Sequence, residues 1–232
     1  MKRLAAGLLL VSSCASPAAL PSAADQESLQ ARLRSALDSP YAVGRFYAEY
    51  EADGRVLMKC RGTARAFRSG IVQVEEEAAT GTPVRFLRVG DRAWIHRDGW
   101  KDAAGTEWES LGTGFQSPYE VLQALETAAE KFAAHRQGGI VCPGDRRMLD
   151  PVASRAGSHP PETVPIEGVL KAGFRDGPLV TRFSAETGPS TVWIAKMDIV
   201  SWGPAPPMRF DDIPAPFTPD MKAAVRKATE GK

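Results

Sequence analysis

The chain has 232 residues, of which 43% are hydrophobic and 25% are charged. This is the composition of an ordinary globular protein, long enough for one generous domain or two small ones. The formal net charge is +1, and it falls to −1 without Lys2 and Arg3. Because proteins bind nucleic acid through clustered Lys and Arg, this balance argues against a nucleic-acid partner.

The first 13 residues have the pattern of an export signal. Lys2 and Arg3 give a positive start, and Leu4–Val11 is a short apolar run. A bilayer span needs about 20 apolar residues, so this run is a signal core and not a transmembrane helix. No other segment is apolar enough to span a membrane.

Val11-Ser12-Ser13-Cys14 resembles the lipobox of bacterial lipoproteins, an aliphatic residue and two small residues before a cysteine. The resemblance implies that residues 1–13 are a signal peptide and that Cys14 carries acyl chains such as palmitate. Two or more chains give stable membrane anchoring. The alternative is an ordinary cleaved signal that ends near Ser22-Ala23-Ala24.

The segment 14–24 is rich in small residues and proline, and we expect it to be a lipidated tether. Residues 25–232 are then a single α+β domain, since no long linker divides them. A lipid anchor places the protein in the bacterial envelope. Ala15 fits the enterobacterial rule that a residue other than Asp after the lipidated cysteine favours the outer membrane, facing the periplasm.

With Cys14 lipidated, an even pair of cysteines remains, Cys60 and Cys142. In an oxidising periplasm they could form a disulfide bond, which would stabilise the fold by about 4–5 kcal/mol through loop-closure entropy. Two separate small core residues are the alternative. The spacing lacks a CxxC pair and does not predict a zinc site.

The domain begins with a helix over Asp25–Leu37, where leucine recurs every four residues. Alternating strand patterns follow, and the turns Asp53-Gly54 and Gly90-Asp91 are strong hairpin signals. Short hairpin turns favour an antiparallel meander. The five predicted strands are Tyr41–Ala52, Arg55–Phe67, Gly70–Ala78, Val84–Val89 and Arg92–Arg97.

A second helix opens at Ser117-Pro118-Tyr119-Glu120, which combines an N-cap serine, a first-turn proline and a capping-box glutamate. Its apolar face continues to Ala133, and Gly138-Gly139 terminates it. Further strands are predicted at Ile140–Cys142, Ile166–Phe174, Leu179–Ala185, Thr191–Trp202 and Met208–Ile213, before a last helix over Met221–Thr229.

The hairpin Val84–Arg97 followed by Asp98-Gly99-Trp100, within this order of elements, resembles the LolA/LolB-like carriers and the mycobacterial LppX/LprG-type lipoproteins. The resemblance implies a curled antiparallel half-barrel covered by an N-terminal helix, a central helix and a short C-terminal helix. It also implies an apolar cavity for a lipid or another hydrophobic ligand. The predicted ligand-binding residues are Phe46, Val56, Met58, Phe86, Trp94, Leu122, Leu125 and Phe132.

The same residues could instead fill a solid core. The protein would then be an envelope scaffold or interaction module, with Trp100, Trp108 and Gly203–Pro219 as its surface contacts. The three histidines show no metal-ligand spacing, and there is no GxSxG nucleophile motif. We therefore expect no metal, no cofactor and no enzymatic activity.

Overall fold

In the computed structural model, the described residues are 23–78, 83–103, 117–129, 134–136, 139–143, 146–149, 152–153, 156–172, 178–206 and 217–230. The predicted signal peptide and Cys14 lie outside this part of the chain. So do Trp108, Phe132 and the predicted strand Met208–Ile213.

The described elements are three α-helices, a short 3-10 helix and 11 strands of one sheet. The helices are α1 (Ala23–Asp38), α3 (Pro118–Ala129), η1 (Arg146–Met148) and α5 (Pro219–Glu230). The strands are β1 (Tyr41–Ala52), β2 (Arg55–Phe67), β3 (Ile71–Glu76), β4 (Val84–Val89), β5 (Arg92–His96), β6 (Trp100–Asp102), β7 (Ala134–Arg136), β8 (Gly139–Pro143), β9 (Glu167–Ala172), β10 (Leu179–Glu186) and β11 (Thr191–Gly203).

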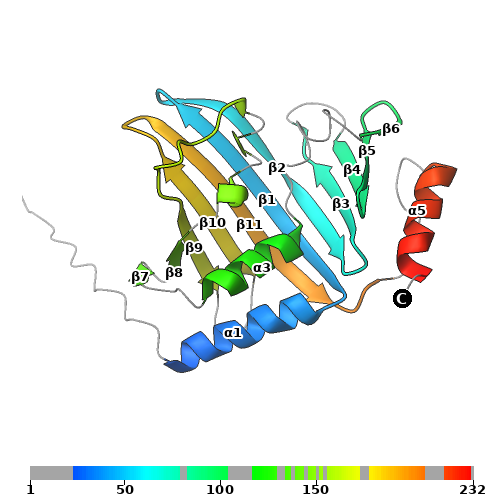
Figure 1. Ribbon diagram of the computed structural model, residues 1–232, viewed down its shortest axis with the longest axis horizontal. Coiled ribbons are helices and arrows are strands. Elements are labelled where there is room, and N and C mark those ends of the chain that lie inside the picture. The colour runs from blue at the N-terminus through cyan, green and yellow to red at the C-terminus, as the bar shows by residue number, and fades with distance from the viewer. Residues whose placement is uncertain are drawn as a thin grey trace, which may run out of the picture.

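All neighbouring strands pair antiparallel, in the order β6-β5-β4-β3-β2-β1-β11-β10-β9-β8-β7 (Figure 1). Only the pairing of β1 with β11 joins strands that are distant in sequence. The chain therefore starts in the centre of the sheet, runs out to the β6 edge, re-enters at the β7 edge and returns to the centre. The segment that carries α3 connects the two edges. Both edge strands have only three residues, which limits edge-to-edge aggregation.

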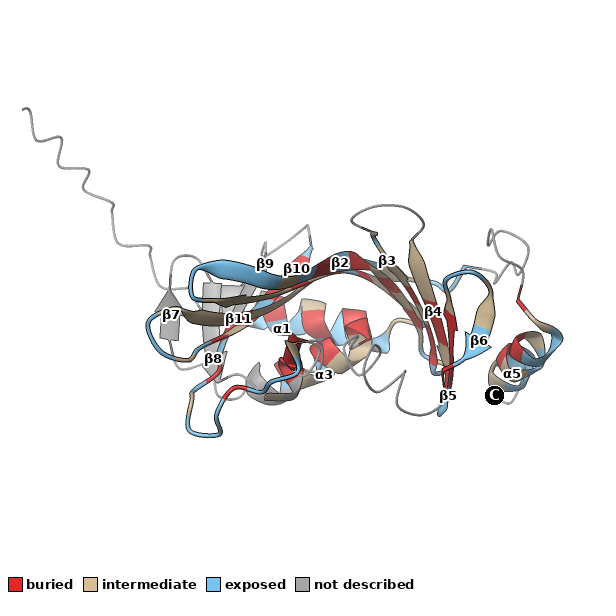
Figure 2. Cartoon of the chain, turned by 90° about the horizontal axis from the view of Figure 1, so that it is seen from above, coloured by how far each residue is buried: buried red, intermediate tan, exposed pale blue. Residues whose placement is uncertain are grey.

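The sheet is curled and open, and in profile it forms an arch with α1 and α3 beneath it (Figure 2). Register shifts at Val43/Gly44 and at Tyr50/Glu51 interrupt the pairing of β1 with its two neighbours. Such irregularities bend a strand and increase its twist. This architecture confirms the predicted α+β half-barrel.

The concave face carries the larger apolar cluster. It combines the leucine stripe of α1, the apolar face of α3 and inward residues such as Phe46, Phe86 and Trp193. The convex face carries a second cluster at β3–β5, where α5 packs on the sheet through Met221 and Val225. Each helix therefore covers one side of the sheet, α1 and α3 the inner side and α5 the outer side.

Glycines allow close approaches on the concave face. Gly44 lies beneath the start of α3, and a Cβ there would be 3.2 Å from Pro118 Cγ. At Gly62 a Cβ would overlap the Glu75 carbonyl oxygen and would come within 2.6 Å of Phe46 Cζ. Neither position has room for a side chain, so these glycines bring the helix and the Phe46 ring onto the sheet.

The sequence predicted most elements within a few residues, including both hairpin turns, where Asp53 and the two turn glycines have positive φ. The predicted length of the central helix was wrong. The described part of α3 ends at Ala129, and Ala134–Arg136 forms strand β7. Strand β6 was also missed. With three residues each, these edge strands are too short to show a period-2 pattern.

We expect Gly62→Ala to destabilise the protein by about 1–3 kcal/mol, because the new methyl group overpacks a fixed backbone contact. Thermal unfolding followed by circular dichroism measures the effect. Thr63→Ala, at the next position on the opposite face, is the control and should cost less than about 1 kcal/mol. Equal melting temperatures for the wild type and Gly62→Ala would contradict the close packing at this position.

Candidate functional site

The concave cluster brings together four of the residues predicted to contact a ligand. Phe46, Phe86, Leu122 and Leu125 are all buried in it, and Met58 packs against it from near the beginning of β2. Strands β1, β2 and β4 supply three of these side chains and α3 supplies two. Helix α3 therefore faces the strands β1, β2 and β4, which carry the other residues of this predicted ligand-binding group.

The other predicted ligand residues do not join this group. Val56 is 52% exposed, near the tip of the β1–β2 hairpin, beside the register shift. Trp94 is buried on the convex face under α5, because its neighbours Ala93 and Ile95 face the concave side. Phe132 lies outside the described residues. The ligand-binding role of the whole set stays a prediction.

The two cysteines of the predicted disulfide lie on strands that are far apart in the sheet. Cys60 is buried on the concave side of β2, and Cys142 is on β8. Four strands separate β2 from β8, and adjacent strands are about 4.8 Å apart. A disulfide needs Cα atoms within about 7 Å, so it would have to cross the concave space. The pairing stays a prediction.

The first turn of α3 is held by several polar contacts. Ser117 Oγ accepts a hydrogen bond from Glu120 N at 3.2 Å, and a Glu120 carboxylate oxygen accepts one from Ser117 N, which confirms the predicted capping box. Arg88 Nη2 on β4 lies 2.9 Å from Glu120 Oε1. The hydroxyl of Tyr119 donates to the carbonyl of Ser39, beyond the end of α1. The start of α3 is thus tied to both the sheet and α1.

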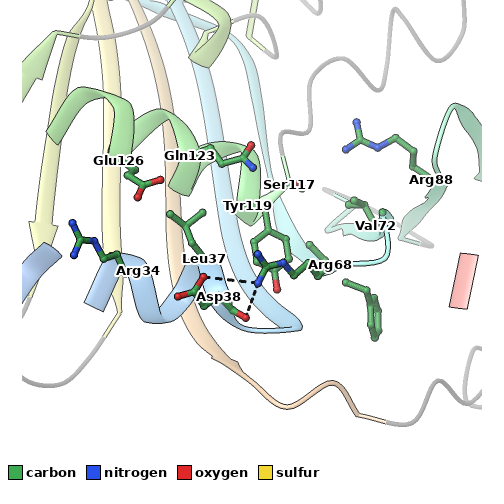
Figure 3. A pocket seen from close by; sticks show the side chains of 13 residues that line it. Arg34, Leu37, Asp38, Arg68, Val72, Arg88, Ser117, Tyr119, Gln123 and Glu126 are labelled. Atoms are coloured by element: carbon green, nitrogen blue, oxygen red, sulfur yellow. Dashed lines mark hydrogen bonds and ion pairs between the residues drawn. The ribbon is translucent and has the colours of Figure 1, made fainter. Parts of the chain in front are cut away.

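Beside this turn lies a half-open pocket of about 380 Å³, between α1, α3 and the β2–β3 turn (Figure 3). Its walls combine apolar and charged side chains from five elements. They include Arg34, Leu37, Asp38, Ala66, Phe67, Arg68, Val72, Arg88, Tyr119, Gln123 and Glu126.

The pocket is amphipathic. Ala66 and Val72 belong to the concave apolar cluster and Leu37 packs against it, so the apolar wall of the pocket is continuous with that cluster. The rim carries charges of both signs. Arg68 donates to the Asp38 carbonyl at 2.8 Å, and its guanidinium lies 3.9 Å from the Asp38 carboxylate. A polar rim around an apolar wall suits a ligand with a polar head and an apolar tail.

None of the rim residues was predicted to contact a ligand. The sequence identified Ser117 and Glu120 only as helix caps, and Arg88 only as part of a strand. The Arg88–Glu120 pair joins residues 32 positions apart, on opposite sides of the concave space. Such a pair leaves no local periodicity or motif, so only the fold shows it.

The described residues were also compared with the patterns of a metal site and of a membrane-spanning helix. No group of three or more His, Cys, Asp or Glu side chains is arranged to hold a metal ion. No described helix is long and apolar enough to cross a membrane.

No protein-family model matches the chain, and no curated protein is significantly similar to it. Among solved structures, the chain is similar to the crystal structure of the Mycobacterium tuberculosis lipoprotein LppX. The match covers 82% of this chain and 100% of that chain, with 15% sequence identity and a TM-score of 0.37. At this level of similarity, a function has to be argued from the residues of the chain itself.

We expect Tyr119→Phe to lower stability by about 1 kcal/mol, because the Ser39 carbonyl loses its hydrogen bond. In a chain of this size that lowers the melting temperature by about 2–4 °C. Tyr41→Phe is the matched control, since the Tyr41 ring packs on Phe67 and no described residue accepts a hydrogen bond from its hydroxyl. A similar loss in both variants would argue against the tie between α3 and α1.

Tyr119→Phe should also change how the stability of the protein depends on pH in alkaline solution. Burial raises the pKa of Tyr119 to about 12 from 10.0. The unfolded chain therefore loses this proton first, and the contribution of Tyr119 to stability is complete below pH 10.0 and disappears as the pH rises towards 12. The difference in melting temperature between the wild type and Tyr119→Phe should shrink over this range. A constant difference would contradict the assigned pKa shift.

Proposed function

We propose that the protein is a lipid-anchored envelope protein without enzymatic activity, which binds a lipid or another amphiphilic molecule between the concave face of its sheet and helices α1 and α3. The observation that carries this proposal is the amphipathic pocket. It opens to solvent on one side, and on the other its apolar wall is continuous with the concave cluster.

The concave face has the chemistry that an acyl chain requires. Its inward positions on β1 and β2 include several small residues, which are Ala48, Cys60, Gly62, Ala64 and Ala66. Moving a chain from water to such a surface gains about 0.8 kcal/mol per CH₂ group. A long acyl chain would therefore gain about 10 kcal/mol.

Binding in this way requires α1 and α3 to separate from the sheet, at least in part. The first turn of α3 has polar ties to the sheet and to α1, and beyond that turn Leu122 and Leu125 pack in the apolar cluster. The first turn would then act as the fixed end of the helix. The remainder would give way, and an incoming chain would replace its contacts with the sheet.

A non-enzymatic scaffold is the second candidate, and the burial of the concave cluster favours it. Phe86, Leu122 and Leu125 have at most 2% of their surface exposed, as in a closed core. In a scaffold these contacts would be permanent and the pocket would be a surface feature. The two candidates differ in whether material binds between the helices and the sheet.

A tryptophan placed in the pocket separates the two candidates. Residues 14–232 with Cys14→Ser would be titrated with a fluorescent long-chain fatty acid, and bound material would be identified by native mass spectrometry. Leu37→Trp should weaken binding at least about 10-fold, which is the effect of losing about 1.4 kcal/mol. Leu57→Trp is the control, because Leu57 is 61% exposed on the β1–β2 hairpin and should tolerate the same change.

Equal binding by the two variants would place the ligand elsewhere. A wild-type chain with neither bound material nor affinity for the probe would favour the scaffold. The melting temperatures of both variants would be measured, so that a loss of folding is not taken for a loss of binding.

The anchor is tested separately. Cys14→Ala should abolish palmitate labelling in bacterial cells and move the protein from the membrane fraction to the soluble fraction, because the acylated thiol is gone. Ser13→Ala keeps a small residue before the cysteine and should leave labelling intact. Labelling that persists in Cys14→Ala would contradict lipidation at this residue.

A further inference from the structure

The convex face of the central strands carries a basic patch that the proposed ligand site does not use. We define it by Arg45 on β1, Arg61 and Arg65 on β2, Arg182 on β10 and Lys196 on β11. Each of these residues alternates with buried residues of the concave face, so each projects from the outer side of the arch. Helix α5 covers the outer side only at β3–β5 (Figure 2).

The register of the strands places several of these cations in neighbouring positions. Arg61 pairs with Tyr47, Tyr47 with Lys196, and Lys196 with Arg182, which makes one row across four strands. Side chains directly opposite each other have Cβ atoms about 5 Å apart, and like charges in that position destabilise a sheet. Lys196 and Arg182 are directly opposite each other, and the carboxylate of Asp198, 3.1 Å from Lys196 Nζ, offsets the repulsion between them.

Only part of this charge is neutralised. Arg61 pairs with Glu77 at 2.5 Å, and Lys196 pairs with Asp198 at 3.1 Å. Within the described part of the chain, Arg45, Arg65 and Arg182 form no ion pair. Three cations of the patch therefore lack an ion pair among the described residues, whereas the acidic side chains on the same outer face of these strands include Glu49, Glu186 and Asp198.

We propose that the basic patch docks the domain on an anionic lipid bilayer. Its cations would face the headgroups, and Tyr47, half-buried among them, has the amphipathic ring that suits a membrane interface. The proposal rests on the proposed anchor, which would hold the domain near a bilayer and raise its effective concentration there. In this orientation the convex face meets the lipid, and the concave side with its two helices faces away from it.

Vesicle co-sedimentation tests this orientation without the anchor. Residues 14–232 with Cys14→Ser should bind vesicles of phosphatidylcholine and phosphatidylglycerol at low salt but not pure phosphatidylcholine, and about 0.5 M salt should release it. The triple variant Arg45→Gln, Arg65→Gln and Arg182→Gln should lower the partition coefficient about 100-fold, since each cation near an anionic surface contributes about a factor of five.

The control variant removes three exposed cations from the other end of the molecule, by Arg97→Gln, Lys101→Gln and Arg226→Gln. It makes the same change in net charge and should change partitioning less than about threefold. Equal loss in both triple variants, equal binding to neutral vesicles, or no binding to anionic vesicles would overturn the proposal. Binding to an acidic polysaccharide but not to vesicles would also overturn it.

Fatty-acid binding is measured on the same proteins. The Arg45, Arg65 and Arg182 substitutions lie on the opposite face from the pocket, so they should leave that affinity unchanged. If this triple variant loses vesicle binding and keeps fatty-acid binding, the result supports the basic patch and leaves the proposed ligand site unaffected. If the protein binds vesicles normally but does not bind fatty acid, the result contradicts the proposed ligand site and leaves the basic patch unaffected.

Discussion

The pairing of β1 with β11 is the constraint on which the rest of the structure depends. It joins the first and last strands in the centre of the sheet through 12 residue pairs, interrupted by one register shift. Two meanders then extend outwards, and the chain can pass from one edge to the other only by crossing a face of the sheet. Helix α3 lies on that crossing segment, and its apolar stripe packs on the concave face beside α1. The covered concave face is thus a consequence of strand order.

The two faces of the same strands have different roles, because side chains alternate along a strand. On β2, Cys60, Gly62, Ala64 and Ala66 face the helices, whereas the intervening positions carry cations and other outward residues. Small inward residues let α3 lie close to the sheet. The outward positions are constrained only by solubility and by partners, so charge can concentrate on them without disturbing the core.

Local signals in the sequence were sufficient for most elements and insufficient for their assembly. The turns at Asp53-Gly54 and Gly90-Asp91 and the capping box at Ser117 act within a few residues, and each was predicted correctly. The end of α3 was not, because alanines near Ala129 suit a helix without requiring one. The β1–β11 pairing and the pocket join distant segments and have no local pattern. The curled sheet was predicted through a resemblance of element order, which carries the long-range information that single residues lack.

The pocket rim shows why a site of this kind is hard to find from sequence. Its ion pairs are exposed, as in Arg68–Asp38, where the side chains are 55% and 80% exposed. Such pairs contribute about 0–1 kcal/mol each, so breaking them costs little. The apolar contacts of Leu122 and Leu125 are the larger barrier, and an acyl chain would replace those contacts with its own. In the proposed binding mode, opening would exchange one apolar surface for another, and that exchange would begin at the polar rim.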